Sequence, residues 1–273
     1  MRKTRRKGVG DRVAFDPAAE AHSAPFNRSS LGDPLDSGTI AELVRDLNQK
    51  RQRLPSDYLA WLLEICKGQE VLDIGIVDHS SSRMSRPDWK FGELCKVARS
   101  CVGIDINDSA IAELSRRGFD VKVCDATSET YIGKRFEFVH CGDVIEHVDS
   151  AVALLKFCGR HLEPGGRIFL RTPNCHHFNY RKRVRRLGTD VSNLEHVSYI
   201  TPAHMVELAR RSNLFLVRYY VQWPRRPFWR AMGRALHNLI NFRFRHFVAE
   251  FVSKPETYST IFVYELMAVQ DSS

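Results

Sequence analysis

The sequence lacks the features that mark membrane-spanning and secreted proteins. No apolar stretch approaches the ~20 residues that a membrane-spanning helix requires, and no apolar run follows the basic start MRKTRRKGVGDR. A secretory signal is therefore not expected, and the sequence favours a cytoplasmic protein. The seven cysteines contain no CxxC pair and most lie in apolar runs, which favours reduced, buried thiols over disulfides or a zinc cluster.

The chain does contain enough apolar residues for a core, together with an excess of positive charge. Hydrophobic residues make up 43% of its 273 residues, which excludes wholesale disorder and suits one sizeable α/β domain. The formal net charge is +9, with basic clusters at residues 2–7, 181–186 and 225–245. This excess suits a phosphorylated substrate, a membrane surface or nucleic acid, although a solvated basic surface has the same composition.

The residue pattern divides the chain into a lead-in and one domain. Residues 1–37 are rich in Arg, Pro, Ser, Gly and Asp, which predicts a flexible basic segment, and residues 38–273 are expected to form a single domain. Helical periodicity begins near Ser37 and returns at 58–66. The remaining elements are short β-rich runs at 70–74, 101–106, 121–124, 136–141 and 167–171, and helical patterns between them at 90–98, 109–117 and 151–162. This alternation predicts a mostly parallel sheet with helices on both faces.

The last part of the chain is expected to complete the sheet. The pattern there predicts a basic loop at 176–186, a helix at 202–212, a strand at 215–221, a helical lid or insertion at 224–252 and a last strand at 257–268.

Acidic residues end or follow three of the expected strands: Asp73 in VLDIG, Asp105 in VGIDI and Asp125 in KVCDA. In open α/β sheets, ligands bind outside the carboxyl ends of the strands. Asp105 suits the ribose hydroxyls of an adenosine cofactor, Asp125 its adenine amino group, and Asp73 a cationic amino-acid portion. Gly75 lets the backbone approach a ligand closely. One such Asp is equally well explained as a helix cap, but three at successive strand ends favour the cofactor.

The motifs VLDIG, GIDI, CDA, FEFVHCGDVIEHV and LEPGGRIFLRTPN resemble those of class I S-adenosylmethionine-dependent methyltransferases. They are most similar to the branch of ubiquinone-pathway O-methyltransferases and methyltransferase domains of types 11 and 23, over about residues 56–222. The resemblance implies an α/β Rossmann-like, seven-stranded, mostly parallel sheet with the last strand pair antiparallel, N-terminal helices and a C-terminal helical insertion. It also implies that S-adenosylmethionine is bound by Asp73, Gly75, Ile76, Asp105, Ile106, Asp125, Ala126 and Gly142.

The first loop departs from that family. Three glycines are common there, whereas DIGIVDHS keeps only Gly75, so the loop has a different shape and Asp78, His79 and Ser80 become candidates for contacts. The missing glycines also argue against a dinucleotide-dependent oxidoreductase, whose pyrophosphate needs the GxGxxG turn.

A group of acidic and imidazole side chains follows the strand at 136–141. Asp143, Glu146 and His147 have the spacing i, i+3 and i+4, and His196 lies downstream before an expected helix. The group is similar to the D/E-x-x-E-H plus distant His of metal-assisted small-RNA 2′-O-methyltransferases and some ubiquinone O-methyltransferases. The resemblance implies that all four bind Mg²⁺, Mn²⁺ or Zn²⁺. Without a metal, His147 or His196 would be the general base, with Glu146 beside them as a further catalytic candidate; a third interpretation is capping or packing.

The expected reaction is methyl transfer to oxygen of a small-molecule, glycan or lipid-linked acceptor. The aromatic and basic segment 224–251 favours association with a membrane surface and hence a peripheral location, although a lid packed on the sheet edge also explains its apolar residues. Asn174 at the end of the strand at 167–171 is a candidate substrate contact. An RNA 2′-O-methyltransferase and a non-catalytic binding module are the alternatives, with nucleic acid less favoured. The oligomeric state stays open.

Overall fold

The computed structural model describes residues 33, 35–77, 84, 86, 88–190, 192–223 and 255–269. Three predictions lie wholly or mostly outside these residues. They are the flexible basic segment 1–37, the contacts of Asp78, His79 and Ser80, and the helical insertion at 224–252 with its membrane-facing segment 224–251.

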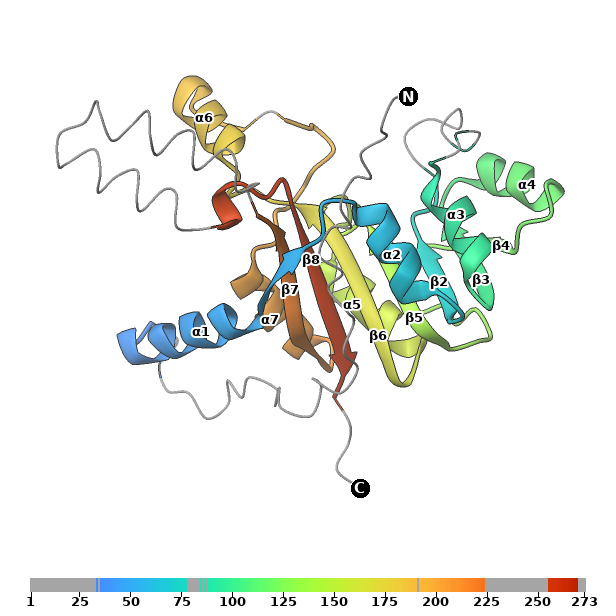
Figure 1. The fold of residues 1–273 in the computed structure, drawn as a ribbon, viewed down its shortest axis with the longest axis horizontal. Helices are drawn as coiled ribbons and strands as arrows, with labels where there is room; N and C mark the ends of the chain where they lie inside the picture. The colour runs from blue at the N-terminus through green and yellow to red at the C-terminus, as the bar shows by residue number, and fades with distance from the viewer. Residues whose placement is uncertain are drawn as a thin grey trace, which may run out of the picture.

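Eight described strands form one sheet in the order β1-β7-β8-β6-β5-β2-β3-β4 (Figure 1). The strands are β1 (Arg51–Leu54), β2 (Glu70–Ile74), β3 (Ser100–Asp105), β4 (Val121–Val123), β5 (Phe136–Gly142), β6 (Leu162–Pro173), β7 (Leu214–Gln222) and β8 (Ile261–Ala268). Strand β8 is antiparallel to β6 and β7, and every other pair is parallel. The predicted Rossmann-like fold class is therefore confirmed, including the antiparallel last pair, but the described sheet has eight strands where seven were expected.

The described helices are α1 (Ser37–Lys50), α2 (Tyr58–Cys66), α3 (Lys90–Val97), α4 (Asp108–Arg116), α5 (Ala151–Arg160), α6 (Phe178–Leu187), α7 (Pro202–Arg211) and the short 3-10 helix η4 (Pro255–Thr257). Apart from α3, the described α-helices begin where the sequence supplies a capping side chain. Asp57 accepts a hydrogen bond from the main chain at the start of α2, and Asn107 and Ser150 do the same for α4 and α5. Each cap satisfies an amide that the helix leaves without a partner.

Two elements differ from the sequence-based expectation. Strand β1 was not expected, because it has four residues of which only Leu54 is buried, and its parallel partner β7 is distant in sequence. The expected basic loop at 176–186 is instead largely helix α6. None of its residues is buried, so local signals explain it: His177 caps its start and Gly188, in a left-handed conformation, ends it.

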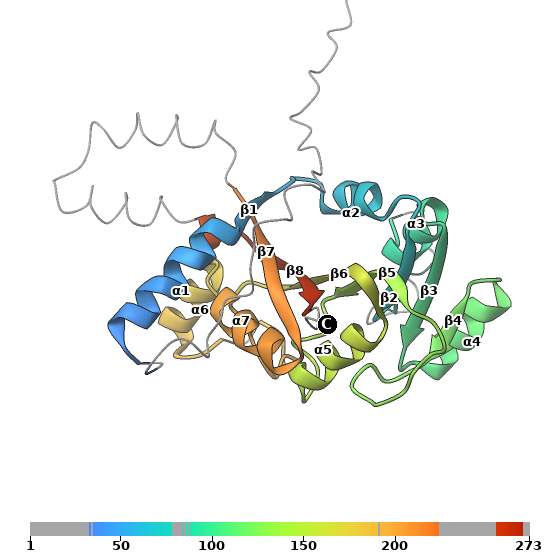
Figure 2. The same cartoon turned by 90° about the horizontal axis from the view of Figure 1, so that it is seen from below.

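The two faces of the sheet carry different helices, with α2 and α3 on one side and α5 and α7 on the other (Figure 2). Successive residues of a strand point to opposite faces. Leu72 and Ile74 of β2 therefore pack in the core under α5 and α7, whereas Val71 packs in the core under α2. Asp73 shares the α2 face with Val71, and this orientation decides its contacts.

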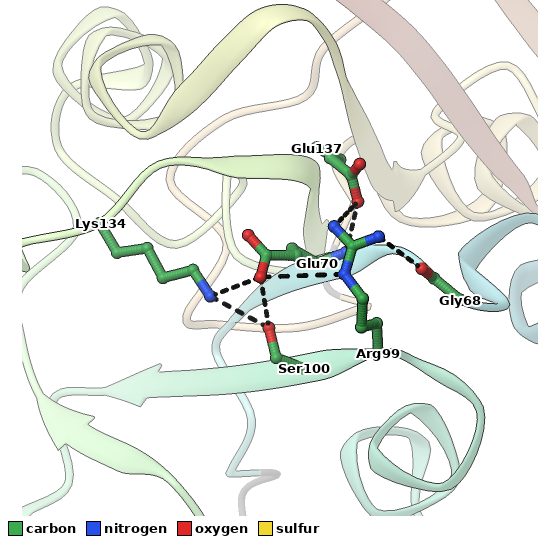
Figure 3. Close-up of polar contacts among 6 residues, drawn as sticks. All are labelled: Gly68, Glu70, Arg99, Ser100, Lys134 and Glu137. Carbon is green, nitrogen blue, oxygen red and sulfur yellow. Dashed lines mark hydrogen bonds and ion pairs between the residues drawn. The ribbon is translucent and has the colours of Figure 1, made fainter.

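A charged network joins the amino ends of β2, β3 and β5 (Figure 3). Lys134 Nζ lies 2.9 Å from Glu70 Oε1 and 3.1 Å from Ser100 Oγ. Arg99 donates to Glu137 Oε2 at 2.9 Å, and the Glu70 amide donates to the same oxygen at 2.8 Å. These contacts lie at the edge opposite the carboxyl ends of the strands, so they stabilise the sheet and leave the candidate site free.

The seven cysteines are free thiols, and four of them, Cys66, Cys124, Cys141 and Cys158, are buried. In the part of the chain that the structure describes, no helix has the length and apolarity needed to cross a bilayer.

Candidate functional site

Asp105 lies at the carboxyl end of β3, half-buried beside the loop that follows β2. Its Oδ2 accepts a hydrogen bond from the Val77 amide at 2.9 Å, and its Oδ1 accepts one from the Asn107 amide at 3.0 Å. These two bonds hold the carboxylate in one orientation and tie the loop after β2 to the end of β3. A carboxylate held in this way can still accept from ligand hydroxyls, because each oxygen has a second lone pair.

The turn after β2 needs glycine for two reasons. Gly75 has a φ of 75°, a conformation that other residues adopt only with strain. A Cβ at this position would also lie 2.3 Å from Cγ2 of Val144. Close packing against the loop after β5 therefore requires a glycine here, in addition to any close approach of a ligand. The side chain of Ile76 is buried, and its carbonyl accepts from Trp89 Nε1 at 3.0 Å.

Two further predicted cofactor residues offer exposed groups. Ile106, next to Asp105, is 74% exposed, so its side chain is available to contact a flat ring. Asp125 is exposed, and its Oδ1 accepts from both the amide and the hydroxyl of Thr127 at 2.7 Å. Ala126 is buried, so its main chain is the part available to a ligand.

The burial of Asp73 and its contact with a histidine were not predicted from the sequence. It is 3% exposed, and its Oδ1 lies 2.6 Å from Nδ1 of His140, its register partner on β5. The Nε2 atom of His140 lies 2.8 Å from the hydroxyl of Tyr58 on α2. Sequence reasoning missed His140 and Tyr58. A histidine within the apolar strand FEFVHCG was the available signal, because a buried imidazole needs polar partners.

A second group of polar side chains follows β5. Donor atoms of Glu146, His147 and His196 all lie within 4.8 Å of one another. The rings of His147 and His196 meet edge to face, with centroids 4.8 Å apart. The loop that carries His196 is docked here because the Val197 amide donates to the carbonyl of Glu146 at 2.9 Å. The fold thus brings together three of the four residues predicted as catalytic groups or metal ligands.

Glu146 is the most perturbed group of this cluster. Its side chain is fully buried, and Oε2 accepts from Thr172 Oγ1 at 3.0 Å. Oε1 is buried and has no hydrogen-bond partner among the described residues. Burial raises the pKa of Glu146 to about 7, and the negative charge of Asp143 adds to the rise, while the hydrogen bond from Thr172 opposes it. A buried carboxyl oxygen without a partner is costly, so it marks a place where a ligand group fits.

Asp143 lies apart from this cluster. It has a φ of 60°, and its Oδ2 lies 3.3 Å from Nη2 of Arg171 on β6. The structure therefore pairs Asp143 with Arg171 and does not bring it into the group formed by Glu146, His147 and His196. Asn174 is also directed elsewhere: its side-chain amide donates to the carbonyls of Glu256 and Ser259 and holds the turn before β8.

Comparisons with known proteins identify the family of this chain. A family model described as "Methyltransferase domain" matches residues 47–219. A ubiquinone biosynthesis O-methyltransferase of Coxiella burnetii (strain RSA 331 / Henzerling II) is 25% identical over 164 residues, which cover 55% of this chain and 65% of that protein. A phosphoethanolamine N-methyltransferase of Triticum aestivum is 26% identical over 144 residues, which cover 49% of this chain and 27% of that protein.

The chain spans less than two thirds of the length of both relatives. Among solved structures, a SAM dependent methyltransferase from Archaeoglobus fulgidus is similar with a TM-score of 0.53 and 16% identity, over 76% of this chain and 90% of that one. At this identity the likeness shows the shared fold.

Proposed function

This chain belongs to the methyltransferase domain family and is an S-adenosylmethionine-dependent methyltransferase, and on that premise we propose that it methylates a hydroxyl oxygen of a small-molecule, glycan or lipid-linked acceptor. The observation that carries the choice of oxygen is the buried, unpartnered Oε1 of Glu146 beside two imidazoles. A hydroxyl must lose its proton during methylation, and this cluster offers groups that take one.

The carboxyl edge of the sheet offers groups that suit each part of the cofactor. Asp105 would accept hydrogen bonds from the ribose hydroxyls, and the exposed side chain of Ile106 would contact the adenine. Asp125 would accept a hydrogen bond from the adenine amino group. The backbone at Gly75 and Ile76 would line the amino-acid end, with Gly142 of β5 and Ala126 completing the cofactor site. When bound, the cofactor supplies a methyl group on a positively charged sulfur.

The groups of this chain then act on the acceptor. Thr172 holds one oxygen of Glu146, so that Oε1 is left to accept the proton of a hydroxyl. A pKa of about 7 matches this role, because a base is most effective when its pKa lies near the working pH. His147 and His196 close the cluster and would bind the acceptor or pass on the proton.

A divalent ion is the second candidate for this cluster. One carboxylate and two imidazoles with donor atoms within 4.8 Å of one another suit Zn²⁺ or Mn²⁺. In this case Glu146, His147 and His196 would be ligands, and the ion would lower the pKa of the acceptor hydroxyl. Exhaustive chelation decides between the two. Activity that survives chelation and is not raised by Mg²⁺, Mn²⁺ or Zn²⁺ supports the metal-free base, and loss that one ion restores supports the metal.

The acceptor class is tested by incubating the protein with S-adenosylmethionine labelled on its methyl group and with extracts of lipids, glycans and RNA. We expect label in a small or lipid-linked acceptor. Label in RNA, with tight and salt-sensitive RNA binding, would instead support the RNA methyltransferase.

Calorimetry with S-adenosylmethionine and its demethylated product tests the cofactor site directly. The Asp105→Ala variant should bind both ligands at least about tenfold more weakly, because it loses charge-assisted hydrogen bonds. If neither ligand binds the wild-type chain at millimolar concentration, the methyltransferase activity is refuted and the non-catalytic binding module is the remaining hypothesis.

A further inference from the structure

A chain of three side chains runs through the core beneath the cofactor edge. Tyr58 of α2, His140 of β5 and Asp73 of β2 are linked by contacts of 2.8 Å and 2.6 Å, and they are here called the Tyr58–His140–Asp73 chain. His140 is fully buried and Asp73 is 3% exposed. Side chains from three elements that are separate in sequence are thus linked to the carboxylate of Asp73, which lies two residues before Gly75.

The raised pKa of Tyr58 and the two contacts together assign the hydrogen-bond donors. Burial raises the pKa of Tyr58 well above its usual range, so its hydroxyl keeps its proton and donates to Nε2 of His140. An imidazole that accepts at Nε2 carries its proton on Nδ1, and Nδ1 therefore donates to Asp73. In this arrangement the contact with Nδ1 of His140 holds the Asp73 side chain in one orientation, and the contact with Tyr58 holds His140 in turn.

Two basic side chains, Lys90 and Arg171, lie close to this chain. Gly142 has no side chain, and a Cβ there would lie 2.7 Å from Nζ of Lys90 and 2.9 Å from Cε1 of His140. The guanidinium carbon of Arg171 lies 5.1 Å from the centre of the Tyr58 ring. Arg171 is paired with Asp143, whereas the Lys90 ammonium lies near the His140 ring that contacts Asp73. A carboxylate and an ammonium group on either side of His140 suit a ligand that carries both charges, as the amino-acid end of the cofactor does.

We propose that Tyr58 and His140 are positioning residues that set the affinity for the amino-acid end of the cofactor by orienting the Asp73 carboxylate. The inference rests on the proposed cofactor site at the carboxyl edge. The ribose and adenine are held separately by Asp105 and its neighbours, so the two ends of the ligand respond to different substitutions.

The test is calorimetry with three ligands on the full chain. S-adenosylmethionine and S-adenosylhomocysteine contain the amino-acid portion, and 5′-methylthioadenosine lacks it. Tyr58→Phe removes only the hydroxyl that anchors His140. We expect roughly tenfold weaker binding of the first two ligands, the effect of losing one hydrogen bond, and unchanged affinity for 5′-methylthioadenosine. Asp105→Ala should weaken all three.

Tyr220→Phe is the matched control, because it removes another tyrosine hydroxyl at the same core, one that donates to Glu265 at 2.6 Å. It should leave all three affinities unchanged. His140→Asn keeps a donor near Asp73 but cannot reach Tyr58, so it should reproduce the effect of Tyr58→Phe. Because both changes break the same contact, the double variant should bind no more weakly than either single one.

Equal losses for all three ligands, or no loss for any, would overturn the inference, as would additive effects of Tyr58→Phe and His140→Asn. Failure of the proposed function has a different signature, since the wild-type chain would then bind none of the three ligands. Thermal unfolding of each variant identifies any that has not folded, and the inference then depends on the remaining members of the set.

Discussion

The carboxyl group of Glu146 combines full burial with a pKa of about 7. The substitution Glu146→Gln keeps the shape and removes the base. We expect cofactor affinity to be unchanged and kcat to fall by roughly 10²–10⁴. In the wild type, kcat should rise with pH through about 7, because the ionised form is the proton acceptor, and the variant should lose this rise. A pH profile of kcat for both proteins, with calorimetry for binding, measures this; an unchanged kcat would contradict the role.

The same carboxyl group makes the stability of the fold depend on pH. Its pKa in the folded protein is raised from the ordinary value of 4.5 to about 7, so the folded state holds a proton in this range that the unfolded chain releases. The free energy of unfolding should therefore fall as pH rises from about 4.5 to 7, by up to about 3 kcal/mol. Glu146→Gln should abolish this part of the decline, as urea denaturation at pH 5 and pH 8 would measure.

Gly75 illustrates how one residue joins two loops. Gly75→Ala places a methyl group 2.3 Å from Val144 in a backbone conformation with a φ of 75°. We expect the free energy of unfolding to fall by about 3 kcal/mol, from backbone strain and overpacking together. Gly118→Ala is the control, because its φ is 87° but no atom lies within 4 Å of the new methyl group. This control should lower the free energy of unfolding by only about 1–2 kcal/mol. If urea denaturation gives equal losses for the two variants, the contact with Val144 makes no contribution.

Among the elements, β2, β3 and β5 have different contacts at their two ends. The candidate site lies at the carboxyl ends, whereas Glu70, Ser100 and Lys134 connect the amino ends (Figure 3). The hydrogen bond from Lys134 is the main cause that lowers the pKa of Glu70. This contribution to stability is present above the ordinary pKa of the carboxyl group and is lost as pH falls through the lowered value.

Lys134→Met tests this link between the strands. We expect a modest loss of stability at pH 7, because the group is solvent-accessible, and a smaller loss in acid, once the pH has fallen below the lowered pKa of Glu70. Urea denaturation at both pH values, at low and high salt, measures the difference. A loss that is the same at both pH values would mean that Lys134 acts through its contact with the Phe136 ring and not through Glu70.

For the whole molecule, ligand binding and folding are coupled. The proposed cofactor site lies at the ends of β2, β3, β4 and β5, so a ligand bound there would stabilise only the folded state. S-adenosylhomocysteine at 100 times its Kd should raise the free energy of unfolding by about 2.7 kcal/mol. Thermal unfolding should shift upwards by several degrees, and the shift should be much smaller for Asp105→Ala at the same ligand concentration. An equal shift in both proteins would place the ligand elsewhere.

The order of elements was largely predictable because it rests on local signals. The strands β2 and β5 are apolar runs of the expected length, and caps such as Asp57 and Asn107 mark the helix starts. Strand β1 was missed because a short, exposed stretch acquires its strand conformation only from pairing with β7. The helix at α6 was missed because its basic residues obscured the stop signal at Gly188.

The sequence by itself determined that acidic residues stand at successive strand ends, because a strand that ends in a carboxylate brings it to the edge of a parallel sheet. Only the tertiary structure decided what each carboxylate meets. Asp73 turns inward to His140, Asp143 pairs with Arg171, and Glu146 lies beside two imidazoles. The reason is physical: periodicity reports which face a side chain is on, whereas its partners come from strand register and loop packing across residues that are distant in sequence.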